Sequence, residues 1–170
     1  MPFFIIHGNI VDVPTDAIVN AANTGLHVGG GVCGTIFAAA GLAEMQAACD
    51  KIGGCATGHA VITPGFRLPA PYVIHAVGPI WQGGNHGEEA LLASAYRSAL
   101  QLATEQGLRS IAFPLISSGI YGYPEAQALS VASLTIGAYL KNHDQLKVYL
   151  VLYGDIIDDL KPSIHPMSKI

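Results

Sequence analysis

Short apolar runs alternate along the chain with segments in which apolar residues recur every three or four positions. Six runs that are rich in β-branched or aromatic residues predict strands: Phe3–His7, Ala17–Ala21, His59–Thr63, Tyr72–Val77, Ser110–Ile116 and Lys147–Tyr153. Helical spacing predicts helices over Glu88–Gln106 and Glu125–Leu140, with shorter ones over Val32–Ala40 and Leu42–Asp50. This alternation predicts one α/β domain over residues 1–170, a three-layer α/β/α sandwich around a mostly parallel sheet.

The tail of the chain has a different pattern. From Asp155 to Ile170 it carries two prolines and a pair of acidic residues, which favours a short helix followed by a loosely held end. No function is assigned to this segment.

Composition narrows the class of protein. Of the 170 residues, 51% are hydrophobic and 12% are charged, so a large core is expected. A formal charge of −4 without any basic run argues against a nucleic-acid polymer or an anionic membrane as partner. The N-terminus lacks the basic region and cleavage site of a signal peptide, and no apolar run is long enough to span a membrane, so a cytoplasmic protein is expected.

The cysteines and histidines do not form a metal-binding pattern. Cys33, Cys49 and Cys55 are an odd, sparse set without a Cys-x-x-Cys pair, and are expected to be free thiols. None of the histidines pairs with another at the spacing of a metal site. Neither a disulfide framework nor a bound metal is therefore predicted.

Two glycine-rich runs carry the clearest signal of a binding site. Gly29–Gly34 and Gly119–Gly122 each follow a predicted strand and precede a predicted helix, so both are expected at the carboxyl edge of the sheet, where open α/β folds bind ligands. Unhindered backbone N–H groups and a helix N-terminus can hold an anion there without Lys or Arg. Two such loops predict two bound phosphates.

Other interpretations of the glycines stay open. The first run satisfies GxGxxG, a dinucleotide-binding pattern, but the acidic residue expected about 20 positions later falls, as Glu44 or Asp50, within a predicted helix. Tight turns without a ligand are the structural alternative, which explains one run more readily than two. A P-loop is excluded because no lysine follows either run.

Four motifs, in order and spread over most of the chain, resemble the macrodomain family. They are IVNAAN at Ile18–Asn23, GGGV at Gly29–Val32, VIHAVGP at Val73–Pro79 and FPLISSGIYG at Phe113–Gly122. The resemblance implies a mixed sheet of six or seven strands and a cleft for ADP-ribose at the strand ends, without metal or cofactor. The implied reaction removes an acyl group from the distal ribose, from O-acetyl-ADP-ribose or from a protein ADP-ribosylated on Asp or Glu.

The resemblance also implies roles for single residues. Two loops are expected to wrap the diphosphate, namely Gly29, Gly30, Gly31 and Val32 in the first and Ser118, Gly119, Ile120 and Tyr121 in the second. Asn23 is expected to orient the distal ribose and a water, Tyr121 to cover that ribose, and Tyr153 to pack on adenine. Asn9 and Ile10 are expected to bind the base as well.

Two positions depart from the family's pattern. Members usually carry Asp at the position of Asn9, and an Asn carbonyl can still accept the hydrogen bond from the adenine amino group, more weakly. Many hydrolytic members carry Asp at the position of Cys33, although some viral members with Cys there are hydrolytic. Cys33 is either a small buried residue at the helix start or a thiolate base favoured by the helix N-terminus. The catalytic candidates are thus Asn23, Cys33 and Tyr121, and the alternative function is a reader that binds ADP-ribose without chemistry.

Four further residues have mainly structural interpretations. His75, in the middle of an apolar strand, is expected to be a hydrogen-bonded core residue. His27, beside the first glycine run, is a weaker candidate for ligand contact. Asn20 is expected to brace the loop backbone, and Trp81 to pack at the rim.

Overall fold

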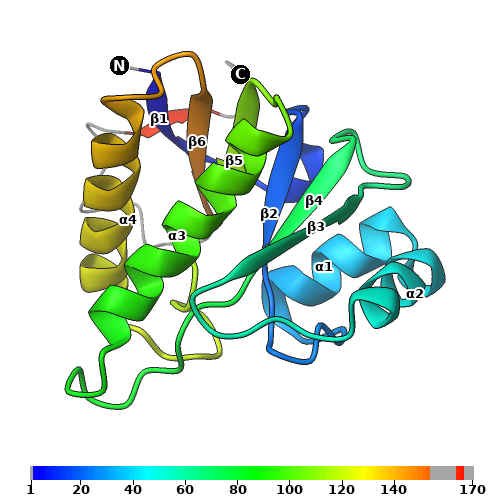
Figure 1. The fold of residues 1–170 in the computed structure, drawn as a ribbon, viewed down its shortest axis with the longest axis horizontal. Coiled ribbons are helices and arrows are strands. Elements are labelled where there is room, and N and C mark those ends of the chain that lie inside the picture. The colour runs from blue at the N-terminus through cyan, green and yellow to red at the C-terminus, as the bar shows by residue number, and fades with distance from the viewer. Residues whose placement is uncertain (1, 154–163, 167–170) are drawn as a thin grey trace.

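The architecture is a seven-stranded sheet between two layers of helices, seen in a computed structural model that describes residues 2–153 and 164–166 (Figure 1). The strand order is β3-β4-β2-β5-β6-β1-β7. The strands are β1 (Phe3–His7), β2 (Ala17–Ala21), β3 (Ala60–Pro64), β4 (Tyr72–Ala76), β5 (Ser110–Phe113), β6 (Lys147–Leu152) and β7 (Ile164–Pro166). Only β3 and β4 pair antiparallel among these strands, so the mixed, mostly parallel sheet is confirmed.

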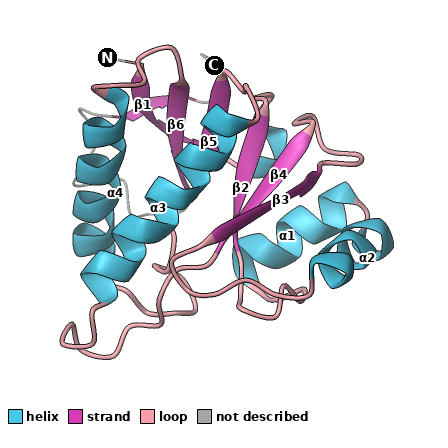
Figure 2. Ribbon diagram, in the orientation of Figure 1, coloured by secondary structure: helices cyan, strands magenta, loops and turns pink. Residues whose placement is uncertain are grey.

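Helices cover both faces of the sheet (Figure 2). One face packs against α1 (Gly31–Ala40) and α2 (Leu42–Ile52), the other against α3 (Glu88–Glu105) and α4 (Glu125–Leu140). A 3-10 turn, η1 (Ile10–Asp12), follows β1. The three-layer α/β/α sandwich and its four helices are confirmed. No single helix among the described residues could cross a membrane; α1 and α2 reach the necessary length and apolar content only as a pair bent by 110°.

Two hydrophobic cores result from the alternation of side chains along the strands. In β2, Ala17 and Val19 face α3 and α4, whereas Ile18 between them faces α1 and α2. The same alternation places Ile111 and Phe113 of β5 in the first core. The sheet therefore separates two cores, and each anchors its own set of loops at the carboxyl edge.

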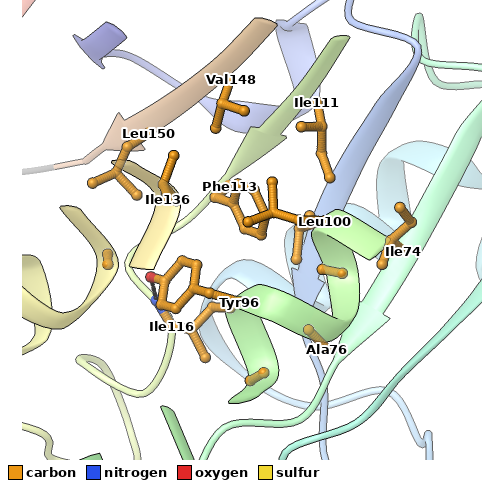
Figure 3. Packing of buried hydrophobic residues seen from close by; sticks show 14 of the residues in the cluster. Ile74, Ala76, Tyr96, Leu100, Ile111, Phe113, Ile116, Ile136, Val148 and Leu150 are labelled. Carbon is orange, nitrogen blue, oxygen red and sulfur yellow. Dashed lines mark hydrogen bonds between the residues drawn. The ribbon is translucent and has the colours of Figure 1, made fainter. Parts of the chain in front are cut away.

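Tyr96 of α3 lies in the core that contains α4, and its hydroxyl is fully satisfied (Figure 3). The hydroxyl donates to the carbonyl of Pro114 at 3.1 Å and accepts from the N–H of Ile116 at 2.9 Å. Burial raises the pKa of this phenol, so it stays protonated and can make both bonds. Tyr96 thereby fixes the backbone just after β5.

Most predicted boundaries agree with the structure to within one or two residues, and two segments differ. The strand predicted over Ser110–Ile116 ends at Phe113, because Pro114 has no N–H to donate and the chain then turns, with Ser117 at a φ of +69°. Residues 164–166 form β7 beside β1, where a loosely held end was expected; three residues that include a proline are too short to be recognised as a strand. The short helix expected after Asp155 lies outside the described residues.

Candidate ligand-binding cleft

A cleft of ≈ 620 Å³ runs along the carboxyl edge of the sheet. Its walls come from the segments that follow β2, β5, β6 and β1, which are adjacent in that order in the sheet. Three strand spacings of about 4.8 Å make this edge roughly 14 Å long, so the cleft suits an elongated ligand. All the predicted site residues line it: Asn9, Ile10, Asn23, Gly29, Gly30, Gly31, Val32, Cys33, Ser118, Gly119, Ile120, Tyr121 and Tyr153.

The first glycine loop leads directly into α1. Gly30 is the N-cap residue and makes no side-chain capping bond, so the first N–H groups of α1 are available to an anion. Gly31 has a φ of +58°, which favours glycine. A Cβ at Gly34 would lie 2.6 Å from the carbonyl oxygen of Gly29, so the helix packs against this loop with no room for a side chain.

The second glycine loop meets the first across the cleft. It is held by backbone bonds from the N–H of Tyr123 to Ser117 and from the N–H of Gly122 to Gly119, at 2.9 and 3.0 Å. Ile120 is 77% exposed, and its Cδ1 lies only 3.0 Å from the position that a Cβ on Gly30 would take. The Ile120 side chain therefore lies over the first loop.

The electrostatics of the cleft come from its backbone. Among the described residues that line it there is no Lys, Arg or His, and Glu125 is the one acidic residue. Ser117 lines this cleft, and its hydroxyl is buried without a hydrogen-bond partner in the described structure. An anion would thus be held by peptide N–H groups and hydroxyls, as the glycine runs predict.

Asn23 is fixed by two hydrogen bonds to one residue. Its Nδ2 donates to the carbonyl of His27 at 2.8 Å, and its Oδ1 accepts from the N–H of His27 at 2.9 Å. One Nδ2 hydrogen and one Oδ1 lone pair remain, so the amide can present a donor and an acceptor to the cleft. The ring of His27 packs over Gly25 and is not among the cleft's lining groups.

Cys33 belongs to a buried polar chain that sequence reasoning missed. The side chain is 5% exposed; its Sγ accepts from Nδ2 of Asn20 at 3.6 Å, and its thiol donates to the carbonyl of His27 at 3.8 Å. Nδ2 of Asn20 also donates to Nδ1 of His75 at 3.1 Å. The expectation that Asn20 braces loop backbone is therefore wrong: it is fully buried in β2, and its amide links two side chains. These bonds are those of a neutral thiol.

His75 completes this chain as the predicted core residue. Since its Nδ1 accepts from Asn20, Nε2 carries the proton and donates to Oγ1 of Thr63 at 2.9 Å. Burial lowers the pKa of His75 to about 4, which keeps the ring neutral. Burial likewise raises the pKa of the Cys49 thiol to about 11, 3.9 Å from His75. In the described part of the chain, no three His, Cys, Asp or Glu residues converge as a metal site would require.

The opposite end of the cleft is apolar and aromatic. Tyr153 follows β6 and is 80% exposed, beside Ile10 and Val151, which are buried. Asn9 follows β1 as the N-cap of η1, and its Oδ1 accepts from the N–H of Val11 at 3.3 Å. We call the five residues Asn9, Ile10, Val151, Leu152 and Tyr153 the base end, because an aromatic ring beside apolar walls suits a heteroaromatic base.

A second buried polar group that sequence reasoning missed is Glu88, which orders the loop before α3. Glu88 is 2% exposed and accepts backbone N–H bonds from Gln82, Gly84 and His86. Burial opposes ionisation of this carboxyl, yet these N–H groups, together with its own, hold its pKa at about 2. The loop so ordered carries Trp81, and this residue packs on Tyr123 with ring centroids 4.7 Å apart, as a packing role predicts.

Trp81 connects the loop that Glu88 orders to the cleft. The backbone N–H of Trp81 donates to the carbonyl of Tyr121 at 2.8 Å. Burial raises the pKa of Tyr121, which lines the cleft, and this favours the protonated hydroxyl. No local sequence pattern shows which N–H groups a carboxylate such as Glu88 will meet.

Comparisons with known proteins agree with this geometry. The model of the Macro domain family matches residues 19–132. A macro domain-containing protein of Chlorobaculum tepidum is 53% identical over 151 residues, covering 88% of this chain and 87% of that protein. An O-acetyl-ADP-ribose deacetylase of Salmonella gallinarum is 51% identical over 156 residues, covering 89% and 87%.

Solved structures share the fold. The Oceanobacillus iheyensis macrodomain with ADP has a TM-score of 0.84 and 42% identity, and the match covers 89% of this chain and 83% of that one. The Trypanosoma brucei macrodomain in complex with ADP-ribose has a TM-score of 0.81 and 39% identity, covering 89% and 63%. With a family model that matches from β2 into α4 and relatives above 50% identity, this chain belongs to the Macro domain family.

Proposed function

We propose that the cleft binds ADP-ribose in one orientation. The two glycine loops receive the diphosphate on peptide N–H groups, the base end takes the adenine, and Asn23 meets the distal ribose. The order of strands supports this arrangement, since Asn23 follows β2 and Tyr153 follows β6, with the second loop after β5 between them. The macrodomains in complex with ADP and ADP-ribose supply the ligand class.

We further propose that the protein hydrolyses ADP-ribosyl esters. Water is consumed, the ester C–O bond is broken, and the products are ADP-ribose with a free hydroxyl and the released acid: acetate from O-acetyl-ADP-ribose, or an Asp or Glu side chain from a modified protein. Homology to proteins named O-acetyl-ADP-ribose deacetylase, at about half identity, supports the first substrate.

The observation that carries this proposal is the fixed amide of Asn23. Two bonds to His27 remove the rotamer freedom of the side chain before a ligand arrives, so the cost of ordering it is already met. An ester leaving group at the ribose needs mainly positioning, and the remaining donor and acceptor of Asn23 can orient both ribose and water. The ligand's own phosphate, held by the loops, would accept the proton of that water in this cleft, where Glu125 is the one carboxylate among the described lining residues.

The reader function is the second candidate, and one observation favours it. The Cys33 thiol donates to the carbonyl of His27 and accepts from Asn20, an arrangement for a protonated group and not for a base. This supports hydrolysis without Cys33 as base, whereas binding alone needs no such group.

Two assays separate these proposals. Calorimetric titration with ADP-ribose should show one binding site. If the protein does not bind ADP-ribose, both the hydrolase and the reader proposals are refuted. Purified protein with O-acetyl-ADP-ribose should release acetate, and with an aspartyl-ADP-ribosylated protein should remove the label. Asn23→Ala should lower kcat at least about 100-fold, since misplaced reactants cost rates of this size, while Cys33→Ala should keep most of the activity. Wild type that binds ADP-ribose and releases nothing from either ester is a reader.

A further inference from the structure

The orientation of the Asn9 amide is determined by its neighbour in η1. The N–H of Val11 is a donor, so the amide atom that faces it, at 3.3 Å, must be the oxygen. The backbone carbonyl of Asn9 also accepts from Asp12 at 3.1 Å, which holds the turn closed. This bond uses one of the two Oδ1 lone pairs, so the amide keeps one Oδ1 lone pair and the Nδ2 hydrogens for a ligand in the cleft that Asn9 lines.

This amide widens the chemistry expected at the position. The Asn9 carbonyl, expected to accept from the amino group of adenine, keeps a lone pair for that bond while it accepts from Val11. The Nδ2 donor of the same amide matches an acceptor on the base. Adenine offers an amino donor at its 6-position and acceptors on its ring nitrogens, whereas a 6-oxopurine offers an oxygen acceptor at the 6-position itself.

The other side chains of the base end do not select between these bases. Ile10, Val151 and Leu152 are buried apolar walls, and the exposed ring of Tyr153 can stack on any purine. Among the described residues of the base end, Asn9 is the one whose side-chain amide can read the edge of the base. Because this amide offers both a donor and an acceptor, it can serve either substituent at the 6-position.

We propose that the base end of the cleft accepts 6-oxopurine nucleotides, such as those of hypoxanthine, as readily as adenine nucleotides, with Nδ2 of Asn9 donating to the 6-oxygen. This inference rests on the proposed function, because it uses the orientation that places the base beside Asn9 and Tyr153.

The test compares ADP with inosine diphosphate, which differ at the 6-position and in the protonation of the adjacent ring nitrogen. Each is titrated into wild-type protein, into Asn9→Asp and into Asn142→Asp. The last variant adds the same charge at the end of α4, before β6 begins and so at the opposite edge of the sheet from the cleft. The ratio of the two Kd values cancels any effect of charge on the diphosphate, which both ligands share.

We expect the wild type and Asn142→Asp to bind the two nucleotides within about threefold of each other. A carboxylate presents acceptors only, whereas the Asn9 amide presents an acceptor and a donor. Asn9→Asp should therefore shift the ratio toward ADP by about tenfold or more, as when a hydrogen bond to a charged group is strengthened with one base and lost with the other.

Two results would overturn the inference while leaving ADP-ribose binding intact. Wild type that prefers ADP by about tenfold shows that Nδ2 does not serve a 6-oxygen. An unchanged ratio in Asn9→Asp shows that the residue does not read the base. Protein that binds neither ADP nor ADP-ribose refutes the proposed function instead.

Discussion

Gly34 gives the sharpest test of the idea that backbone geometry makes the binding site. It lies within α1, where replacing glycine by alanine ordinarily stabilises a helix by about 0.5–1 kcal/mol. Here the new Cβ would lie 2.6 Å from the carbonyl oxygen of Gly29, against the 3.4 Å at which ordinary van der Waals contact begins. Gly29 must therefore move by roughly 0.8 Å, and overpacking of this kind costs about 1–3 kcal/mol.

The expected result for Gly34→Ala combines these terms. We expect a net destabilisation of about 1 kcal/mol, because the contact outweighs the gain in helix propensity. ADP-ribose affinity should fall at least about tenfold, since the displaced carbonyl belongs to the loop whose N–H groups receive the diphosphate. Urea unfolding gives the first quantity and calorimetry the second.

Gly137 provides the matched control. It lies in α4, with no atom within 4 Å of the Cβ that alanine would add. Gly137→Ala should raise stability by about 0.5–1 kcal/mol and leave ADP-ribose affinity unchanged. If Gly34→Ala stabilises the protein as much as Gly137→Ala and binds ADP-ribose like wild type, the contact with Gly29 does not constrain the loop.

Three other predictions concern acid stability and the base end. The pKa of Glu88 is lowered from 4.5 to about 2, so its ionised carboxylate stabilises the fold above pH 4.5, and this contribution is lost as the pH falls toward 2. Urea titrations should therefore show the difference in stability between wild type and Glu88→Gln shrinking from pH 4.5 to pH 2. The pKa of His75 is lowered from 6.5 to about 4, so the protein should lose about 3 kcal/mol of stability as the pH falls from 6.5 to 4. His75→Gln should not show this loss of stability with falling pH. If the variant loses stability over that range as the wild type does, a group other than His75 is responsible. Tyr153→Ala should weaken ADP-ribose binding about 10-fold through lost stacking, while Tyr153→Phe should not, as calorimetry would show.

The strands, the helices and the two glycine loops were predictable, because each follows from the residue pattern within its own segment. Two glycine runs, each between a strand and a helix, favour a binding edge over tight turns alone, so both loops and the edge that they share could be located before any coordinates. The strand and helix limits likewise follow from spacing, and α4 is correct to the residue over Glu125–Leu140.

Contacts between side chains from distant segments were not predictable, because they depend on how the strands and helices align in the fold. Asn20 and His75 meet because β2 and β4 pair them directly, and no feature near either residue indicates that partner. The hydroxyl of Tyr96 reaches the backbone after β5 only because α3 crosses that strand. Glu88 likewise meets its N–H donors through the path of an irregular loop. Satisfaction of buried polar groups is a property of the assembled fold.

The placement of the two loops has a consequence for the whole molecule. The first loop continues into a helix that packs on one side of the sheet, and the second is tethered by Tyr96 to the layer on the other side. A small molecule bound to both loops would add a further link between the two sides of the sheet, beside the strands and the contact of Ile120 with the first loop. Ligand at 100 times its Kd would add about 2.7 kcal/mol to the unfolding free energy of both halves together. Occupancy could then be followed as slower proteolysis anywhere in the domain, far from the nucleotide itself.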